Sequence, residues 1–309
     1  MAGITWLHLS DWHQGFKERD HEQRNKVLDG LIQDIKNRKS VCNELERIDF
    51  IVFSGDLAFS GKKNEYDEEA KKFLDKVLEV TELSRDRLFI VPGNHDFDRE
   101  RKKRYLPDEF RKTFPEDEES YNKIEQWLEN DEDREILLNP FKAYRNFVAE
   151  YNGQKSPDYG STKVFDDING IKVGLLGLNS ALMSERKYVT VEEKKSVNNE
   201  EVVEKKEKLD DKRQLIVGEC QISKNFPKIK DCDLRIAVLH HPLEWLTDFK
   251  KNDIESSLRD NFDFVLSGHE HESQFDMNIG ARGSFGFIPA GATYQDNKYP
   301  NGYSFVHLD

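Results

Sequence analysis

Five short clusters of Asp, Asn and His residues lie along this chain, and each directly follows an apolar segment. The clusters are Asp11-Trp12-His13, Gly55-Asp56, Gly93-Asn94-His95-Asp96, His240-His241-Pro242 and Gly268-His269-Glu270-His271. The segments before them read ITWLHLS, DFIVFS, RLFIVP, LRIAVL and FDFVLS. Strands that end at oxygen or imidazole ligands can bring those ligands together along one edge of a sheet. The clusters therefore predict a metal site at the strand ends.

The candidate ligands are too many and too varied for a single ion. They are Asp11, His13, Asp56, Asn94, His240, His269 and His271. The Asp56 carboxylate has two oxygens and can bridge two cations, and Asp11 and His13 can face one ion if their segment is extended. Nitrogen and oxygen donors without thiolate favour Mn²⁺, Fe or Zn²⁺, of which we expect Mn²⁺. The set predicts two divalent ions that share a bridging ligand.

Taken in order, the motifs D-x-H, G-D, G-N-H-D, H-H-P and G-H-x-H resemble those of the calcineurin-like metallophosphoesterase superfamily and span nearly the whole chain. The resemblance implies that Asp56 bridges two ions, each with its own terminal ligands. One set is Asp11, His13 and His271, and the other is Asn94, His240 and His269. It also implies that His240, two residues before the proline, is the ligand, whereas His241 is structural or lies at the rim.

His95 is not an expected ligand. The resemblance implies that it lies over the substrate, where it donates to a phosphate oxygen or protonates the leaving group, and that Asp96 orients its ring. A carboxylate beside an imidazole raises the pKa of the ring and keeps a proton available. The alternative is that His95 only shapes its loop. The attacking group is expected to be a hydroxide that the ions generate, and the chain has no convincing Ser or Cys nucleophile motif.

Apolar periodicity predicts the elements that position these residues. The first hundred residues alternate strands at 4–10, 49–54 and 87–91 with helices at about 21–39 and 64–80. Near-continuous apolar strands linked by helices indicate a parallel sheet covered on both faces.

The second half of the chain is richer in strands. Asn169-Gly170 predicts a hairpin turn between two of them. The expected strands are 162–168, 171–178, 234–239, 262–267, 286–289 and 303–308. Together with the resemblance, the pattern predicts an α/β (α+β) fold: a four-layer αββα sandwich of two mixed sheets flanked by helices, with 1–309 as a single domain.

Two charged stretches interrupt this pattern. Residues 98–160 show helical spacing at 121–128 and 141–151, so we expect a helical insertion. Residues 185–215 repeat Glu and Lys with few apolar residues, which is typical of a flexible insertion or a solvated helix.

Composition limits the partners. The 47 basic and 60 acidic residues give a net charge of −13, which argues against a general electrostatic grip on nucleic acid but allows a local basic track. No apolar stretch approaches the roughly 20 residues that cross a bilayer, so we expect a cytoplasmic protein without a membrane partner. The chain ends in a strand-like segment at 303–309, which is compatible with the catalytic part of a longer protein that has a further domain or partner.

These features predict a dinuclear-metal phosphoesterase. We favour a phosphodiesterase or nuclease acting on a nucleotide or nucleic acid, because a large charged insertion begins directly after the G-N-H-D cluster. The alternatives are a phosphomonoesterase of a small substrate, and a catalytic or regulatory module of a larger protein. A scaffold without activity would have lost ligands, and none of the seven is missing.

Overall fold

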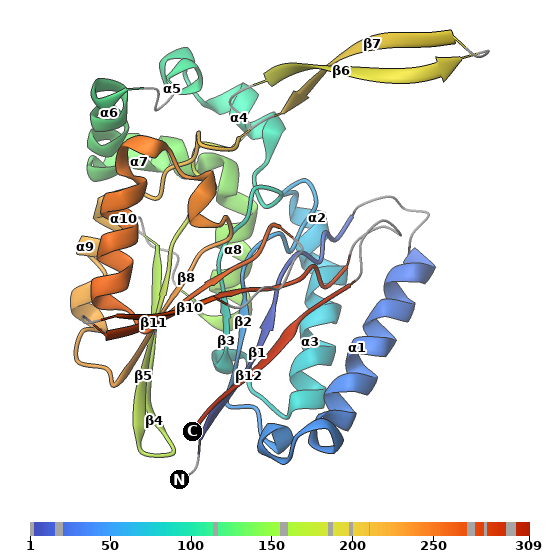
Figure 1. The fold of residues 1–309 in the computed structure, drawn as a ribbon, viewed down its shortest axis with the longest axis vertical. Helices are drawn as coiled ribbons and strands as arrows, with labels where there is room; N and C mark the ends of the chain where they lie inside the picture. The colour runs from blue at the N-terminus through green and yellow to red at the C-terminus, as the bar shows by residue number, and fades with distance from the viewer. Residues whose placement is uncertain are drawn as a thin grey trace.

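Two mixed sheets pack face to face and helices cover their outer faces (Figure 1), so the predicted αββα sandwich is confirmed. The computed structural model describes residues 3–15, 21–113, 117–154, 160–184, 188–197, 200–209, 211–270, 276–280, 283–294 and 301–309. Among the helices in these ranges, none is long and apolar enough to cross a bilayer.

The first sheet has four strands, in the order β12-β1-β2-β3. Their bounds are β1 Ile4–Leu9, β2 Phe50–Phe53, β3 Leu88–Ile90 and β12 Ser304–Leu308. Strands β1, β2 and β3 are parallel, and β12 pairs antiparallel with β1. Every residue of the three parallel strands is buried, which explains why they read as unbroken apolar runs.

The second sheet has six strands, in the order β10-β11-β9-β8-β5-β4. Their bounds are β4 Ser161–Ile168, β5 Ile171–Gly177, β8 Leu234–Val238, β9 Phe264–Ser267, β10 Asp276–Gly280 and β11 Gly283–Pro289. Asn169 (φ 55°) and Gly170 (φ 88°) form the predicted turn between β4 and β5. Strand β10 was not predicted, because it is short and holds only two apolar residues, Met277 and Ile279.

Three apolar layers hold the sandwich together. Trp6 and Val238 belong to the layer between the sheets. Leu7 and Phe53, on the opposite side of the first sheet, pack with the helices α1 and α3, and Leu176 packs with α9 and α10 on the outer side of the second. The bounds of these helices are α1 His21–Val41, α3 Lys71–Thr81, α9 Glu219–Ser223 and α10 Asp248–Asn261.

Shorter helical elements connect the layers. Lys63–Glu65 (α2) leads through a π-helical turn, Tyr66–Ala70, into α3, so the helix predicted at 64–80 is interrupted. The 3₁₀ turns are η2 Asn43–Glu46, η4 Arg85–Arg87, η5 Asn139–Phe141, η6 Phe226–Lys228 and η7 Leu243–Trp245.

The stretch after the G-N-H-D cluster is helical, as predicted. Its helices are α4 Arg99–Tyr105, α5 Asp108–Lys112, α6 Glu118–Glu129, α7 Asp131–Leu138 and α8 Lys142–Asn152. They share a separate apolar cluster in which Phe110 stacks on Trp127, with ring centroids 4.3 Å apart. Leu182 and Ile216 also join this cluster, so the segment after β5 anchors the helices to the sandwich.

The second charged stretch forms a two-stranded antiparallel ribbon rather than the solvated helix that we considered. Strands β6 (Tyr188–Val197) and β7 (Glu200–Leu209) pair along their whole length. Figure 1 shows the ribbon projecting away from the sandwich, at the upper right. The segment contains five valines, and β-branched residues favour strands over helices. The expected flexibility of this insertion stays a prediction.

Candidate metal centre

The loops after β1, β2, β3, β8 and β9 meet at one edge of the sandwich. Backbone hydrogen bonds join them in pairs: Asp11 N donates to Gly55 O at 3.0 Å, and Gly268 N donates to His240 O at 2.9 Å. Side chains link the two sheets, because the Asp11 carboxylate accepts from His269 N at 3.1 Å. Clusters that are far apart in the sequence are therefore neighbours, as the strand-end pattern predicts.

Four of the predicted ligands have a left-handed backbone. They are Asp11 (φ 56°), His13 (φ 49°), Asp56 (φ 60°) and His269 (φ 74°). The expectation that Asp11 and His13 lie in an extended segment is wrong, because the chain turns sharply once β1 ends. The side chains still converge, with His13 Nε2 3.7 Å from Asp11 Oδ1. Left-handed non-glycine residues are strained and cluster at functional sites.

Two motif glycines allow the ligand loops to approach one another. A Cβ added to Gly93 would overlap the Asp56 carboxylate, and one added to Gly55 (φ 102°) would lie 2.6 Å from His240 Nδ1. The glycines of the G-D and G-N-H-D motifs are therefore required by close contact with predicted ligands.

Asp56 lies at the centre of the side-chain cluster and is 1% exposed. Its Oδ2 is 3.1 Å from His13 Nε2 and 3.3 Å from His240 Nε2. Its Oδ1 accepts a hydrogen bond from the backbone N of His95 at 2.8 Å. Burial raises the pKa of Asp56, but the charges of His240 and His95 outweigh burial and hold it well below its usual value. The carboxylate is thus charged and positioned between two histidines.

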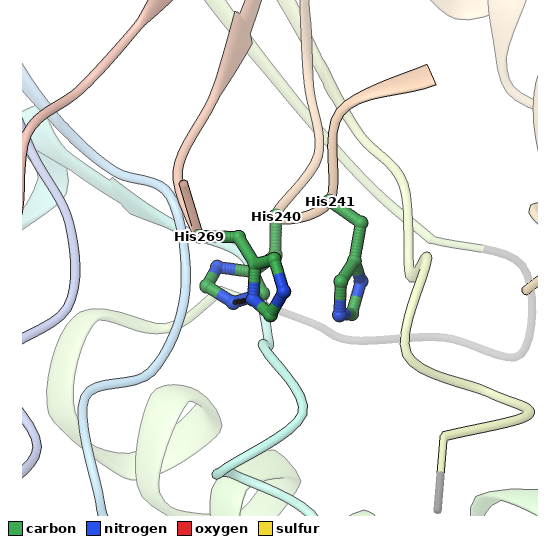
Figure 2. A group of neighbouring side chains, drawn as sticks. All are labelled: His240, His241 and His269. Atoms are coloured by element: carbon green, nitrogen blue, oxygen red, sulfur yellow. Dashed lines mark hydrogen bonds between the residues drawn. The ribbon is translucent and has the colours of Figure 1, made fainter. Parts of the chain in front are cut away.

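A second group of donors surrounds His240. Figure 2 shows the imidazoles of His240, His241 and His269 gathered together from the loops after β8 and β9. His240 Nε2 lies 3.2 Å from both Asn94 Oδ1 and His269 Nδ1. His241 Nε2 lies 3.1 Å from the same Asn94 oxygen, and its Nδ1 is 3.0 Å from Ser180 Oγ.

His95 and Asp96 do not form the pair that we expected. His95 Nδ1 lies 2.8 Å from the Phe59 carbonyl oxygen, and the Phe59 ring stacks on the imidazole with centroids 4.8 Å apart. Burial lowers the pKa of His95 and the charge of Asp56 opposes this only in part. The expectation of a raised pKa is therefore wrong, because the carboxylate that was to raise it contacts other groups.

The Asp96 carboxylate is buried and accepts hydrogen bonds from the loop that carries Asp56, from its own loop and from Tyr66. The donors are the backbone N of Asp56 (2.9 Å), of Ala58 (3.0 Å) and of Gly93 (3.0 Å), and the Tyr66 hydroxyl (2.8 Å). Burial and the nearby Asp56 raise the pKa of Asp96 to about 6, against the opposing effect of these bonds. Asp96 therefore shapes the loop of the central carboxylate and does not orient His95.

A family model described as calcineurin-like phosphoesterase matches residues 4–273. The chain belongs to the calcineurin-like phosphoesterase family. It is also similar to YydB, a metallophosphoesterase-like protein of Bacillus subtilis (strain 168), at 26% identity over 281 residues. The match covers 89% of this chain and 50% of YydB, so the chain spans about half the length of that curated relative.

Solved structures to which the chain is similar are distant in sequence. A phosphatase from Mycoplasma pneumoniae is 16% identical with a TM-score of 0.42, over 94% of this chain and 72% of that one. PhoD is 9% identical with a TM-score of 0.48, over 94% of this chain and 56% of that one. At these values, neither protein bears on the substrate of the present family member.

The donor set of this calcineurin-like phosphoesterase fits divalent cations. His240 Nδ1 lies 2.8 Å from the Ser54 carbonyl oxygen, which can only accept a hydrogen bond, so Nδ1 carries a hydrogen. In the neutral ring, Nε2 therefore has a free lone pair. That lone pair faces oxygens of Asp56 and Asn94, which are acceptors too. Converging acceptors need a proton or a cation between them. Without a metal ion, burial lowers the pKa of His240 but Asp56 raises it to about 9.

Three groups of described side chains could each hold an ion, with ligand atoms within 4.8 Å of one another. The groups are His240, His241 and His269; His13, Asp56 and His95; and Asp11, Asp56 and His240. Six of the seven predicted ligands thus lie together, and His271 lies outside the described residues. His241, expected to be structural or at the rim, is fully buried, and its position next to His240 is its only signal in the sequence.

A buried histidine lies beneath the cluster. His8, in the middle of β1, is fully buried, and its Nε2 is 2.9 Å from Ser54 Oγ. The carbonyl oxygen of the same Ser54 accepts from His240 Nδ1. Partners of this kind fix the tautomer and orientation of a metal-binding imidazole.

Proposed function

We propose that this calcineurin-like phosphoesterase is a dinuclear-metal phosphodiesterase that acts on nucleotide or nucleic acid substrates. The position of Asp56 carries the proposal, because its Oδ2 is approached both by His13 and by His240, which belong to different proposed ligand sets, so this charged carboxylate can bridge two cations. Buried carboxylates without a paired cation are costly, and divalent ions would remove that cost.

The proposed ligands divide around Asp56. Asp11 and His13, with His271 outside the described residues, would hold one ion, and Asn94, His240 and His269 would hold the other. We expect Mn²⁺, with Fe or Zn²⁺ as the alternatives, because all of these donors are oxygen or nitrogen. Two divalent ions supply Lewis acidity to the phosphoryl oxygens and lower the pKa of the attacking water.

His95 acts on the substrate through Nε2. The Phe59 carbonyl accepts from Nδ1, so Nδ1 keeps its hydrogen and Nε2 exchanges a proton with the ester. A phosphate anion beside the ring raises its pKa, which offsets the lowering by burial. His95 would then donate to a phosphoryl oxygen or protonate the leaving group.

We favour a diester over a monoester because the helices that start at Arg99 follow the G-N-H-D cluster directly. Arg99 is exposed and lies close enough to lower the pKa of His95, so it adds positive charge next to the cluster, where it could contact an anionic substrate. The alternatives are a phosphomonoesterase, and a module of a larger protein, which the match to half of YydB favours.

The test combines metal content with substrate choice. With Mn²⁺, the protein should hold about two ions per chain and hydrolyse bis(p-nitrophenyl) phosphate faster than p-nitrophenyl phosphate. Asp56→Asn, which keeps the shape but removes the charge, should lower turnover by about 1,000-fold. Asp260→Asn, on the exposed face of α10, is the matched control and should leave it unchanged. A metal-free protein, or full activity in Asp56→Asn, would refute the proposal.

A further inference from the structure

Two tryptophans lie next to the predicted ligands, in opposite environments. Trp12, between Asp11 and His13, is 2% exposed and stacks on Phe73 with ring centroids 4.1 Å apart. Trp245 is partly exposed, and its ring lies at the other end of the cluster. Trp12 is therefore part of the packing beneath the site, whereas Trp245 is accessible from solvent.

The indole of Trp245 contacts the cluster directly. Its centroid lies 4.2 Å from that of His269, at an interplanar angle of 84°, and 5.9 Å from that of His241. His269 is itself only partly buried, so the two rings lie on the open side of the metal site. A group attached to a phosphate at the cluster would meet the indole first on this side.

Trp245 is held in place before any substrate binds. Its Nε1 donates to Glu270 Oε1 at 2.9 Å, and its backbone N and O bond to Pro242 O (3.0 Å) and Leu215 N (3.3 Å). Part of the side chain also packs on the apolar layer beneath α10. A ring fixed in this way loses little conformational freedom when a ligand stacks on it.

The other partly exposed ring at the cluster has a different task. Phe59 stacks on His95 at an interplanar angle of 25° and its carbonyl accepts from the same imidazole, so its ring face is occupied. Lys212 Nζ lies over the Trp245 ring, 5.8 Å from its centroid. An aromatic surface beside a positive charge suits a base that is linked to a phosphate.

We propose that Trp245 is a specificity-determining residue that stacks the nucleobase of a nucleoside phosphodiester whose phosphate lies at the metal cluster. The inference rests on the proposed phosphodiesterase function and names its substrate class. Stacking is indifferent to base identity because every base has a π-face. It also explains how a chain of net charge −13 can bind such a substrate without a large basic surface.

Two esters with the same leaving group test the inference: thymidine 5′-monophosphate p-nitrophenyl ester and methyl p-nitrophenyl phosphate. The protein with Mn²⁺ should prefer the thymidine ester in kcat/KM by roughly tenfold or more. Trp245→Leu should remove most of that preference, leaving the methyl ester within about twofold and the metal content unchanged, whereas Trp245→Phe should retain it. Competition by a short single-stranded oligonucleotide distinguishes a strand from a free nucleotide as the source of the base.

The outcomes separate this inference from the proposed function. Equal rates for the two esters, or an equal loss for both in Trp245→Leu, would overturn the stacking role and leave the phosphodiesterase intact. Hydrolysis of neither ester would refute the phosphodiesterase. In that case, a fluorescence titration with thymidine 5′-monophosphate tests the stacking role separately. If Trp245 stacks on the base, the nucleotide should quench tryptophan fluorescence in the unchanged protein but not in Trp245→Leu. Equal quenching in both proteins would refute the stacking role.

Discussion

The metal cluster has a buried floor and a partly exposed rim, and the two are built differently. Asp11, Asp56 and His240 of the floor are at most 1% exposed, and their loops are joined by backbone hydrogen bonds. Asn94, His95, His269 and Trp245 of the rim are partly exposed side chains. Backbone hydrogen bonds fix the floor, which suits ions that need a fixed geometry, whereas the rim presents two further proposed ligands, Asn94 and His269, together with His95 and Trp245 on the solvent side.

The largest effect should come from the floor. His240→Ala removes a donor next to Asp56, and metal analysis should find the affinity reduced by more than the roughly 10- to 100-fold typical of changes beside a ligand. Turnover should fall with it.

His241→Ala is the matched control, because the two histidines are neighbours in sequence and both approach Asn94. It should keep both ions and lose less activity. If His241→Ala loses a metal ion and His240→Ala does not, the assignment of the floor is wrong and the two residues exchange roles.

His95, unlike the proposed ligands Asn94 and His269 of the rim, should affect turnover without affecting metal binding. His95→Ala removes the group that exchanges a proton with the substrate, so kcat should fall about 100-fold while the metal content stays the same. The loss should be greater for a phenyl ester than for a p-nitrophenyl ester, since phenolate is the more basic leaving group. An equal loss for both esters would exclude protonation of the leaving group by His95.

A pH effect should originate beneath the floor. Burial lowers the pKa of His8 from 6.5 to about 3, and the charge of Asp11 opposes this only partly. Between pH 6.5 and about pH 3, His8 is therefore protonated in the unfolded chain but not in the folded chain. Acidification thus stabilises the unfolded chain, and the free energy of unfolding falls. His8 should contribute about 2 kcal/mol of that loss between pH 7.5 and pH 5. Denaturant titrations with chelator should show a smaller loss in His8→Leu, and parallel curves would contradict the prediction.

The smallest effect should come from Trp245→Leu. We expect it to remove a roughly tenfold preference in kcat/KM for the thymidine ester over the methyl ester. If Trp245→Leu instead lowers metal affinity, Trp245 acts by supporting His269 and not by contacting the substrate.

Much of the fold and most of the donor set could be predicted. Strands such as β2 are apolar throughout because both of their faces are covered, and Asn169-Gly170 marks the β4–β5 turn, because both are local consequences of burial and backbone geometry. The β6–β7 ribbon could not be predicted in this way, since its repeated Glu and Lys give no apolar pattern that marks a strand.

The sequence by itself determined which residues can bind metal and that they follow strand ends, because burial patterns and ligand chemistry depend on residue type and order. Only the tertiary structure decided which groups they face. Asp96 bonds to the backbone of Asp56, 40 residues earlier, rather than to its neighbour His95. Trp245 joins the cluster because parallel strands deliver distant loops to one edge. Such contacts depend on how the loops close over one another, which no local pattern records.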